Sequence, residues 1–209
     1  MVDYEKAIKR PFQDINKLII GSFLSIIPII NLLVTGYFVY AAKNTMKKKD
    51  AIPEWDNWAE LFIKGLSVAI IGLIYALPGI ALLFVGIGSI IIGAIISGSA
   101  ATTMYTAIAG GGLLVLAGLF FLLLSGLITP MALMSFADKG NFGDAFAFGK
   151  IIRKVFTVQY LVSWLVVLVY SIVAGLLSLM IPFVGYAIAS FVIGMTAFTV
   201  FAEVYTEIK

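Results

Sequence analysis

The sequence predicts an all-α fold, a multipass transmembrane helical bundle of about six spans with short amphipathic interfacial helices. Of the 209 residues, 62% are hydrophobic and 12% are charged, whereas about 25% of the residues in a typical soluble domain are charged. The charges fall in four clusters, at 3–17, 43–64, 138–154 and 203–209, and only tyrosine is ionisable between them. This distribution is typical of a chain that keeps its charges at the water interfaces of a bilayer.

Three charge-free stretches separate the clusters. Each is long enough to cross a bilayer, because one span needs about 20 apolar residues. Their lengths predict one, three and two crossings, and we expect these crossings to form a single integral membrane domain, 1–209. The predicted spans are 18–42, 65–86, 87–109, 112–136, 155–180 and 183–206.

Glycine and proline residues set the predicted joints between spans. Gly86, Gly88 and the glycine run at 110–112 divide the second stretch, and Pro182 divides the third. Membrane helices tolerate proline, so two further prolines are expected inside or near the ends of helices. These are Pro78 and Pro130.

The first stretch admits two structures, because Pro28 and Asn31 fall near its middle. Either one helix kinked at Pro28 crosses once, or two short helices enter and return as a hairpin. The sequence IPIIN at 27–31 resembles IPFVG at 181–185, where a break at Pro182 is predicted. One span is the default, because each arm of a hairpin would hold only about a dozen apolar residues.

Six spans would place the termini and the 138–154 cluster on one side of the membrane and the 43–64 cluster on the other. The first side carries nine Lys and Arg residues and the second carries five, so both termini are predicted to be cytoplasmic. If the first and second stretches both return to their starting side, all four clusters become cytoplasmic instead. The first apolar run is too long for a cleaved signal peptide, and we expect it to remain in the mature protein.

An aromatic face in the segment 52–65 predicts an interfacial helix. Trp55, Trp58 and Phe62 recur at i, i+3 and i+7, and Asn57 is placed to cap the helix. Tryptophan is enriched at membrane interfaces, so these three residues are interpreted as an interfacial anchor. The alternative is a docking surface for a soluble partner or a lipid headgroup.

The same motif recurs along the chain. NWAELFIKG at 57–65 and NFGDAFAFG at 141–149 share an asparagine, an acidic residue, a phenylalanine and a glycine at matching spacing, and DYEKAI at 3–8 is a fainter copy. The repeat indicates a reused unit, an interfacial helix that leads into a span. Repeated membrane units often build transporters, with sites at the repeat interface.

Small residues recur every four positions in the predicted third span. They are Ser89, Gly93, Ser97 and Ala101. Such a face lets two membrane helices pack closely, so it is interpreted as a helix-packing face, with a ligand-lining groove or a dimer seam as alternatives.

The sequence offers little chemistry for catalysis. Without cysteine or histidine, the chain lacks disulfides and the commonest metal ligands, and we expect no catalytic residue, metal or cofactor. The nearest carboxylate pairs are Asp138 with Asp144 and Glu203 with Glu207, which fit solvated helix ends better than an active site. The net charge of +3 is typical of juxtamembrane Lys and Arg beside anionic lipid, so no nucleic-acid partner is expected.

Two long segments, 7–44 and 52–78, carry a family pattern, and FGDAFAFGKIIRK at 142–154 extends it. The segments resemble the polytopic membrane family catalogued as domain of unknown function 4013, found largely in archaea and some bacteria. The resemblance covers most of the chain apart from 86–112. It implies a multispan protein, supplies no activity and carries over no functional residue. The most specific positions are Gly36, Tyr37, Pro53, Glu54, Trp55, Asp56, Trp58, Leu61, Phe62 and Gly65.

These observations predict a multipass protein of the cell membrane that is not an enzyme. We expect a structural or accessory subunit that contacts membrane lipids and assembles with itself or with another membrane protein. The alternative is a transporter-like or permeation protein for a small neutral or lipidic solute, which would use the repeat interface and the helix breaks at Pro28 and Pro182.

Overall fold

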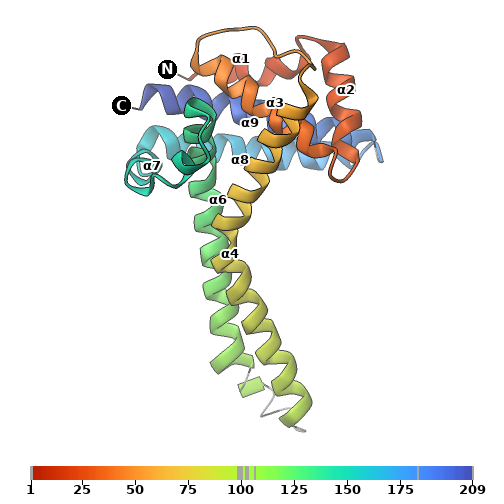
Figure 1. Cartoon of the computed structure of the whole chain (residues 1–209). Helices are drawn as coiled ribbons and strands as arrows, with labels where there is room; N and C mark the ends of the chain where they lie inside the picture. Colours follow the sequence, from red (N-terminus) through yellow and green to blue (C-terminus); the bar gives the residue numbers. More distant parts are fainter. Residues whose placement is uncertain (1, 98–100, 102–103, 106, 183, 209) are drawn as a thin grey trace. The chain divides into compact units, whose positions relative to one another are not determined.

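Helices form all the regular secondary structure in the described part of the chain, which confirms the predicted all-α class. The computed structural model describes residues 2–97, 101, 104–105, 107–182 and 184–208. Figure 1 shows the helices in chain order. They are α1 (Tyr4–Lys9), η1 (Arg10–Phe12), α2 (Ile15–Ile26), α3 (Asn31–Met46), α4 (Trp58–Ser97), η2 (Ala107–Gly112), α6 (Leu113–Lys139), η3 (Phe142–Phe146), α7 (Phe148–Val155), α8 (Val158–Ser178) and α9 (Val184–Glu207).

Four helices of the described chain are long and apolar enough to cross a membrane. They are Trp58–Ile96, Ala109–Lys139, Val158–Ser178 and Val184–Glu207. This is the composition of a membrane protein, but the predicted count of about six spans is not confirmed.

The first charge-free stretch holds two helices, so the default of one kinked span is wrong. α2 ends at Ile26 and α3 begins at Asn31, and the two helices pack against each other. Pro28 lies between them beside Ile29, whose φ of 71° is left-handed and unfavourable for a β-branched residue. With 12 residues, α2 is about 18 Å long, which is short of the roughly 30 Å hydrocarbon core.

The second charge-free stretch lacks a helix break that was predicted, whereas the first has a break that the default did not include. α4 runs unbroken from Trp58 to Ser97 over 40 residues, so the breaks predicted at Gly86 and Gly88 are wrong. A glycine inside a helix costs only about 1 kcal/mol, and an apolar environment strongly favours keeping the backbone hydrogen-bonded within the helix. Pro78 and Pro130 lie inside α4 and α6, as predicted.

The interfacial helix predicted within 52–65 is also not a separate element. The backbone before Trp58 is irregular, and the residues from Trp58 onward form the first turns of α4. The two clearest of the three copies of the repeated motif fold differently. Asn57 has a φ of 51°, whereas Asn141 is extended and precedes the 3-10 helix η3. Short helices do occupy the other two copies, at α1 and at η3 with α7.

Close contacts divide the chain into two compact units. One comprises Met1–Ile71 with Pro130–Lys209, and the other comprises Gly72–Thr129. The prediction of a single membrane domain over 1–209 stays a prediction.

The first unit is built around α9. This helix packs against α1, α2, α3 and α8, and its Phe191 and Met195 lie in a core with Tyr37 and Phe38 of α3. Glycine allows α3 to approach the start of α4 very closely. A Cβ atom at Gly36 would lie 1.9 Å from the Leu61 carbonyl oxygen, and a Cβ at Gly65 would lie 1.8 Å from the Leu32 carbonyl oxygen.

The second unit is an antiparallel pair made by α4 and α6 (Figure 1). A Cβ at Gly118 would lie 2.9 Å from the Gly79 carbonyl oxygen, and a Cβ at Gly86 would lie 2.9 Å from the Gly111 carbonyl oxygen. Gly79 and Gly86 are seven residues apart, as are Gly111 and Gly118. Small residues two helical turns apart on each helix thus allow the two backbones to pack closely.

Candidate functional site: a charged pocket around Arg10

The most unusual polar residue in the first unit is Arg10, whose side chain is almost completely buried. The Asp3 carboxylate caps α1 by accepting a hydrogen bond of 2.9 Å from the Lys6 amide. Ala7, Arg10 and Pro11, at i, i+3 and i+4, then form the buried face of α1 and η1. Because Arg10 lies on this face, its guanidinium enters the protein and only 3% of the residue is exposed.

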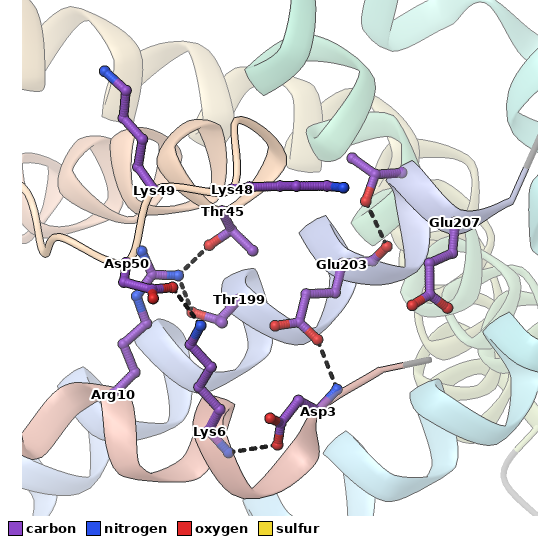
Figure 2. Close-up of a pocket in the computed structure, with 11 residues that line it drawn as sticks. Asp3, Lys6, Arg10, Thr45, Lys48, Lys49, Asp50, Thr199, Glu203 and Glu207 are labelled. Carbon is purple, nitrogen blue, oxygen red and sulfur yellow. Dashed lines mark hydrogen bonds and ion pairs between the residues drawn. The ribbon is translucent and has the colours of Figure 1, made fainter.

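The Arg10 guanidinium joins two helices that are distant in sequence (Figure 2). Its Nη1 donates to the Thr45 hydroxyl of α3 and to the Thr199 hydroxyl of α9, the latter at 3.4 Å. Its Nη2 donates to the Ala41 carbonyl oxygen at 3.5 Å. One side chain near the N-terminus therefore bonds α3 and α9 at the same time.

The two threonines are prepared to accept these bonds. Thr45 donates its single hydroxyl proton to the Ala41 carbonyl at 2.9 Å, and Thr199 donates its own to the Met195 carbonyl at 2.8 Å. A hydroxyl has one proton and two lone pairs, so each oxygen is left with lone pairs for Arg10.

The Arg10 charge is only partly balanced. Burial lowers the pKa of the Arg10 guanidinium, and the nearby Asp50 and Glu203 carboxylates oppose this shift. An arginine nevertheless stays charged in proteins. Among the described residues, the Arg10 Nε has no hydrogen-bond partner and no carboxylate lies within ion-pair distance of the guanidinium, so this cation is held mainly by neutral oxygens.

A pocket of about 520 Å³ lies beside Arg10 and is lined almost entirely by polar and charged side chains. Lys6 forms an ion pair with Asp50 across the pocket, and this pair lowers the pKa of the Asp50 carboxyl. The backbone amide of Asp3 donates to Glu203 at 2.8 Å. The lining residues are Asp3, Lys6, Arg10, Thr45, Lys48, Lys49, Asp50, Thr199, Glu203, Thr206 and Glu207, four cations and four carboxylates.

These contacts bring together three of the four charged clusters. Lys6 and Asp50 join the first cluster to the second, Lys17 and Glu54 do the same at 2.6 Å, and Asp3 joins the first cluster to the fourth. The third cluster reaches the fourth through Lys154, which donates to the Tyr205 carbonyl at 2.9 Å. All four clusters therefore lie in contact within one compact unit.

Arg10 and its two threonines were not predicted from the sequence as site residues. A signal was present, since Arg10 shares a helical face with Ala7 and Pro11 and interrupts an otherwise small and apolar stripe. The partners gave no local signal, because Thr45 and Thr199 are 35 and 189 residues away.

The predicted anchor residues lie around the start of α4. Trp55 precedes the helix, stacks on the Tyr37 ring with centroids 4.0 Å apart, and donates from Nε1 to the Lys17 carbonyl at 3.3 Å. Trp58 is 46% exposed, and its ring lies 5.9 Å from that of Trp55. Phe62 is half-buried. An anchoring role for these residues stays a prediction.

The predicted small-residue face is only partly within the described residues. The Ser89 hydroxyl donates to the Gly86 carbonyl at 2.8 Å and lies 2.8 Å from the position of a Cβ at Gly111, so Ser89 faces η2, which directly precedes α6. Gly93 is half-buried and Ala101 is exposed, while the Ser97 side chain lies outside the described residues. Whether this face packs against another helix stays a prediction.

The predicted helix breaks lie at turns, and the carboxylate pairs have structural partners. Pro182 follows α8 as Pro28 follows α2. Asp144 pairs with Lys139 at 3.1 Å, and Glu203 accepts the Asp3 amide. Among the described residues, no three acidic side chains are grouped so as to hold a metal ion.

Comparison with known proteins places the chain in a family. Residues 20–184 match the model of a family described as "Protein of unknown function (DUF4013)", which is most of the chain. The chain belongs to this family. The region that matches begins within α2, includes α3, α4, α6, α7 and α8, and ends at the start of α9.

A similar curated protein is an archaeal one without an assigned role. The chain is 30% identical over 98 residues to "Uncharacterized protein MJ1189" of Methanocaldococcus jannaschii, and the match covers 37% of the chain. It covers 35% of the relative, so the chain spans about a third of that protein's length. No solved structure matches the chain.

The structure explains why the residues that carried the family resemblance occur together. The Tyr37 hydroxyl donates to the Pro53 carbonyl at 2.9 Å, the Tyr37 ring stacks on Trp55, and Gly36 lets Leu61 approach. The loop before α4 is thus held against α3 by several of the residues on which the family resemblance was based.

Proposed function

We propose that the chain is a non-enzymatic accessory subunit of a cell-membrane assembly. The second unit, the α4–α6 pair, would contact a second membrane-protein chain. The observation that supports the proposal is the length of this pair compared with the thickness of a bilayer.

The apolar part of α4 is longer than a bilayer requires. The helix has 40 residues, and it contains no charged residue after Lys64. At 1.5 Å per residue, the segment 65–97 is about 50 Å long, whereas the hydrocarbon core is about 30 Å thick. Helices with such an excess tilt, kink or oligomerise.

Large apolar side chains cover the outer surface of this pair. Phe84, Ile95 and Ile96 of α4 are each more than 75% exposed, and Leu113 and Leu116 of α6 are each 63% exposed. Lipid can cover such residues within the bilayer. Beyond that thickness they would face water, and exposed apolar patches of this kind mark contacts with another protein.

Known contacts of the carboxylates support the absence of catalysis in this proposal. Asp144 pairs with Lys139 and Glu203 accepts a hydrogen bond from the Asp3 amide, so both carboxylates have structural partners. Permeation of a neutral or lipidic solute has less support, because the pocket around Arg10 is lined by charges.

Photo-cross-linking in native membranes tests the proposal. A photoreactive amino acid at Ile95 should yield one discrete cross-linked protein species, either a dimer of this chain or an adduct with another membrane protein. The same group at Gly140, in the exposed loop after α6, is the matched control and should not yield that species. A chain that is monomeric in mild detergent and cross-links only to lipid from Ile95 would contradict an accessory role.

A further inference from the structure

A second pocket, of about 340 Å³, lies where α7 meets the end of α6 and the end of α9. Its position differs from that of the Arg10 pocket, and the two share no lining residue. It is lined by Ser135, Lys139, Lys150, Ile151, Arg153, Lys154 and Tyr205. Four of these seven residues are cations and none is a carboxylate.

Two of the four cations are already engaged by the protein. Lys139 pairs with Asp144 at 3.1 Å. Lys154 donates to the carbonyls of Tyr205 and Ile208 at the end of α9, and its Nζ lies 4.5 Å from the centre of the Tyr205 ring. Burial lowers the pKa of the Lys154 ammonium, with Asp138 in opposition, so a second anion near this cation would be favourable.

The other two cations are free to bind a ligand. Lys150 and Arg153 are exposed, and no carboxylate among the described residues lies within ion-pair distance of either. Arginine binds phosphate with two parallel hydrogen bonds, and lysine adds a point charge. The pocket therefore has the donors and the charge to bind a phosphate group.

The exposed face of α7 indicates where this phosphate comes from. Phe148, Ile152 and Phe156 recur every four residues and are 52%, 41% and 67% exposed, while Ile151 and Val155 on the adjoining face are buried. Cations beside an exposed aromatic and aliphatic stripe are typical of a helix that lies at the lipid headgroup level. A free phosphate ion has no apolar part that could cover this stripe, whereas a phospholipid has acyl chains.

We propose that this pocket binds the headgroup of an anionic phospholipid, with the phosphate between Lys150 and Arg153 and the acyl chains along Phe148, Ile152 and Phe156. Basic pockets between membrane helices bind anionic headgroups in this manner. The inference rests on the proposed membrane location but not on an accessory role or a partner chain.

Lipid-dependent thermal stability of the purified full chain in neutral detergent tests the inference. Dioleoylphosphatidylglycerol should raise the unfolding temperature more than dioleoylphosphatidylcholine does. The double variant Lys150→Gln with Arg153→Gln should lose this difference. The control variant Lys9→Gln with Lys47→Gln removes the same charge from two exposed lysines outside the pocket and should keep it. Conservative replacement by Lys150→Arg with Arg153→Lys should retain most of the preference.

Three outcomes would overturn the inference. The two double Gln variants would respond alike to phosphatidylglycerol, the two lipids would stabilise the native chain equally, or inorganic phosphate at the same concentration would stabilise it as well as the lipid does. The last result would identify a free-phosphate site. If the chain is monomeric, cross-links only to lipid from Ile95 and still shows the selective loss, the accessory role is contradicted and the lipid site stays supported.

Discussion

Gly36 shows how one missing side chain fixes the packing of two helices. No residue larger than glycine fits there, because a Cβ atom would overlap the Leu61 carbonyl at 1.9 Å, and Gly65 has the same relation to Leu32. Backbone atoms form both obstacles, and backbone cannot rotate away as a flexible side chain can. The start of α4 is therefore held against α3 by two reciprocal close approaches.

The variant Gly36→Ala should lower the free energy of unfolding by about 1–3 kcal/mol, because α3 and α4 must separate to admit the methyl group. Thermal unfolding in detergent measures this effect. Gly72→Ala, on α4 with no atom within 4 Å of the new Cβ, is the control and should leave the unfolding temperature unchanged or slightly higher. Equal unfolding temperatures for the two variants would disprove the close approach.

A second prediction at the residue scale concerns Arg10. Arg10→Ala removes the bonds to Thr45, Thr199 and the Ala41 carbonyl and leaves a cavity between α3 and α9. The loss should be about 2–4 kcal/mol, measured by denaturant unfolding in detergent.

The neighbouring Lys9 provides the control for this prediction. Its side chain is 71% exposed and pairs with Glu5, so Lys9→Ala should cost less than about 0.5 kcal/mol. If the two alanine variants unfold at the same denaturant concentration, Arg10 does not hold α3 and α9 together.

At the scale of the elements, the chain repeats one arrangement, two consecutive helices of which the second runs back along the first. α2 returns as α3 and α8 returns as α9, with a proline in each connection, and α4 returns as α6. Each pair begins and ends near a charged cluster. The pairs therefore explain how clusters that are far apart in sequence come into contact.

The register of the α4–α6 pair is open to a direct test, because the chain has no native cysteine. Leu83→Cys with Gly118→Cys should form a disulfide readily, since a Cβ at Gly118 would lie 2.8 Å from the Leu83 Cγ. Oxidation followed by gel electrophoresis after proteolysis between the two helices measures it. Leu83→Cys with Gly126→Cys, two turns along α6, should stay reduced, and preferential bridging of that control pair would refute the register.

The sequence predicts these elements better than it predicts where they end. Charge-free stretches locate the apolar helices, because a charge inside a span is costly, and Pro182 locates the last connection. The helix end predicted at Gly86 is wrong, because glycine, which can end a helix, also allows two helices to pack closely. The seven-residue spacing of Gly86 from Gly79 is the signal that separates the two roles, and Gly111 and Gly118 repeat it.

The candidate site is less predictable than the helices. Arg10, Thr45 and Thr199 are brought together by the packing of η1, α3 and α9, and no local pattern encodes that packing. The second pocket, where α7 meets the ends of α6 and α9, is partly predictable. Lys150, Arg153 and Lys154 are neighbours in sequence, but Lys139 and Tyr205 join them only through the fold.

At the scale of the whole molecule, we infer that all four charged clusters lie on the same side of the membrane. The ion pairs Lys6–Asp50 and Lys17–Glu54, together with the Asp3–Glu203 hydrogen bond, connect three clusters, and Lys154 connects the remaining one. A six-span chain would separate the second cluster from the others. The contacts favour the arrangement in which the first and second stretches both return.

The side on which the clusters lie also determines where the two proposed surfaces are located. If the clusters are cytoplasmic, the basic pocket faces the leaflet in which anionic lipids attract juxtamembrane cations. The long apolar α4–α6 pair is then the surface available to a partner within or beyond the bilayer.

Labelling of single introduced cysteines with a membrane-impermeant maleimide, in intact cells and in inverted vesicles, tests the claim most directly. Lys48→Cys and Gly140→Cys should be labelled from the same side. Labelling of Lys48→Cys and Gly140→Cys from opposite sides would contradict the account and restore a six-span topology.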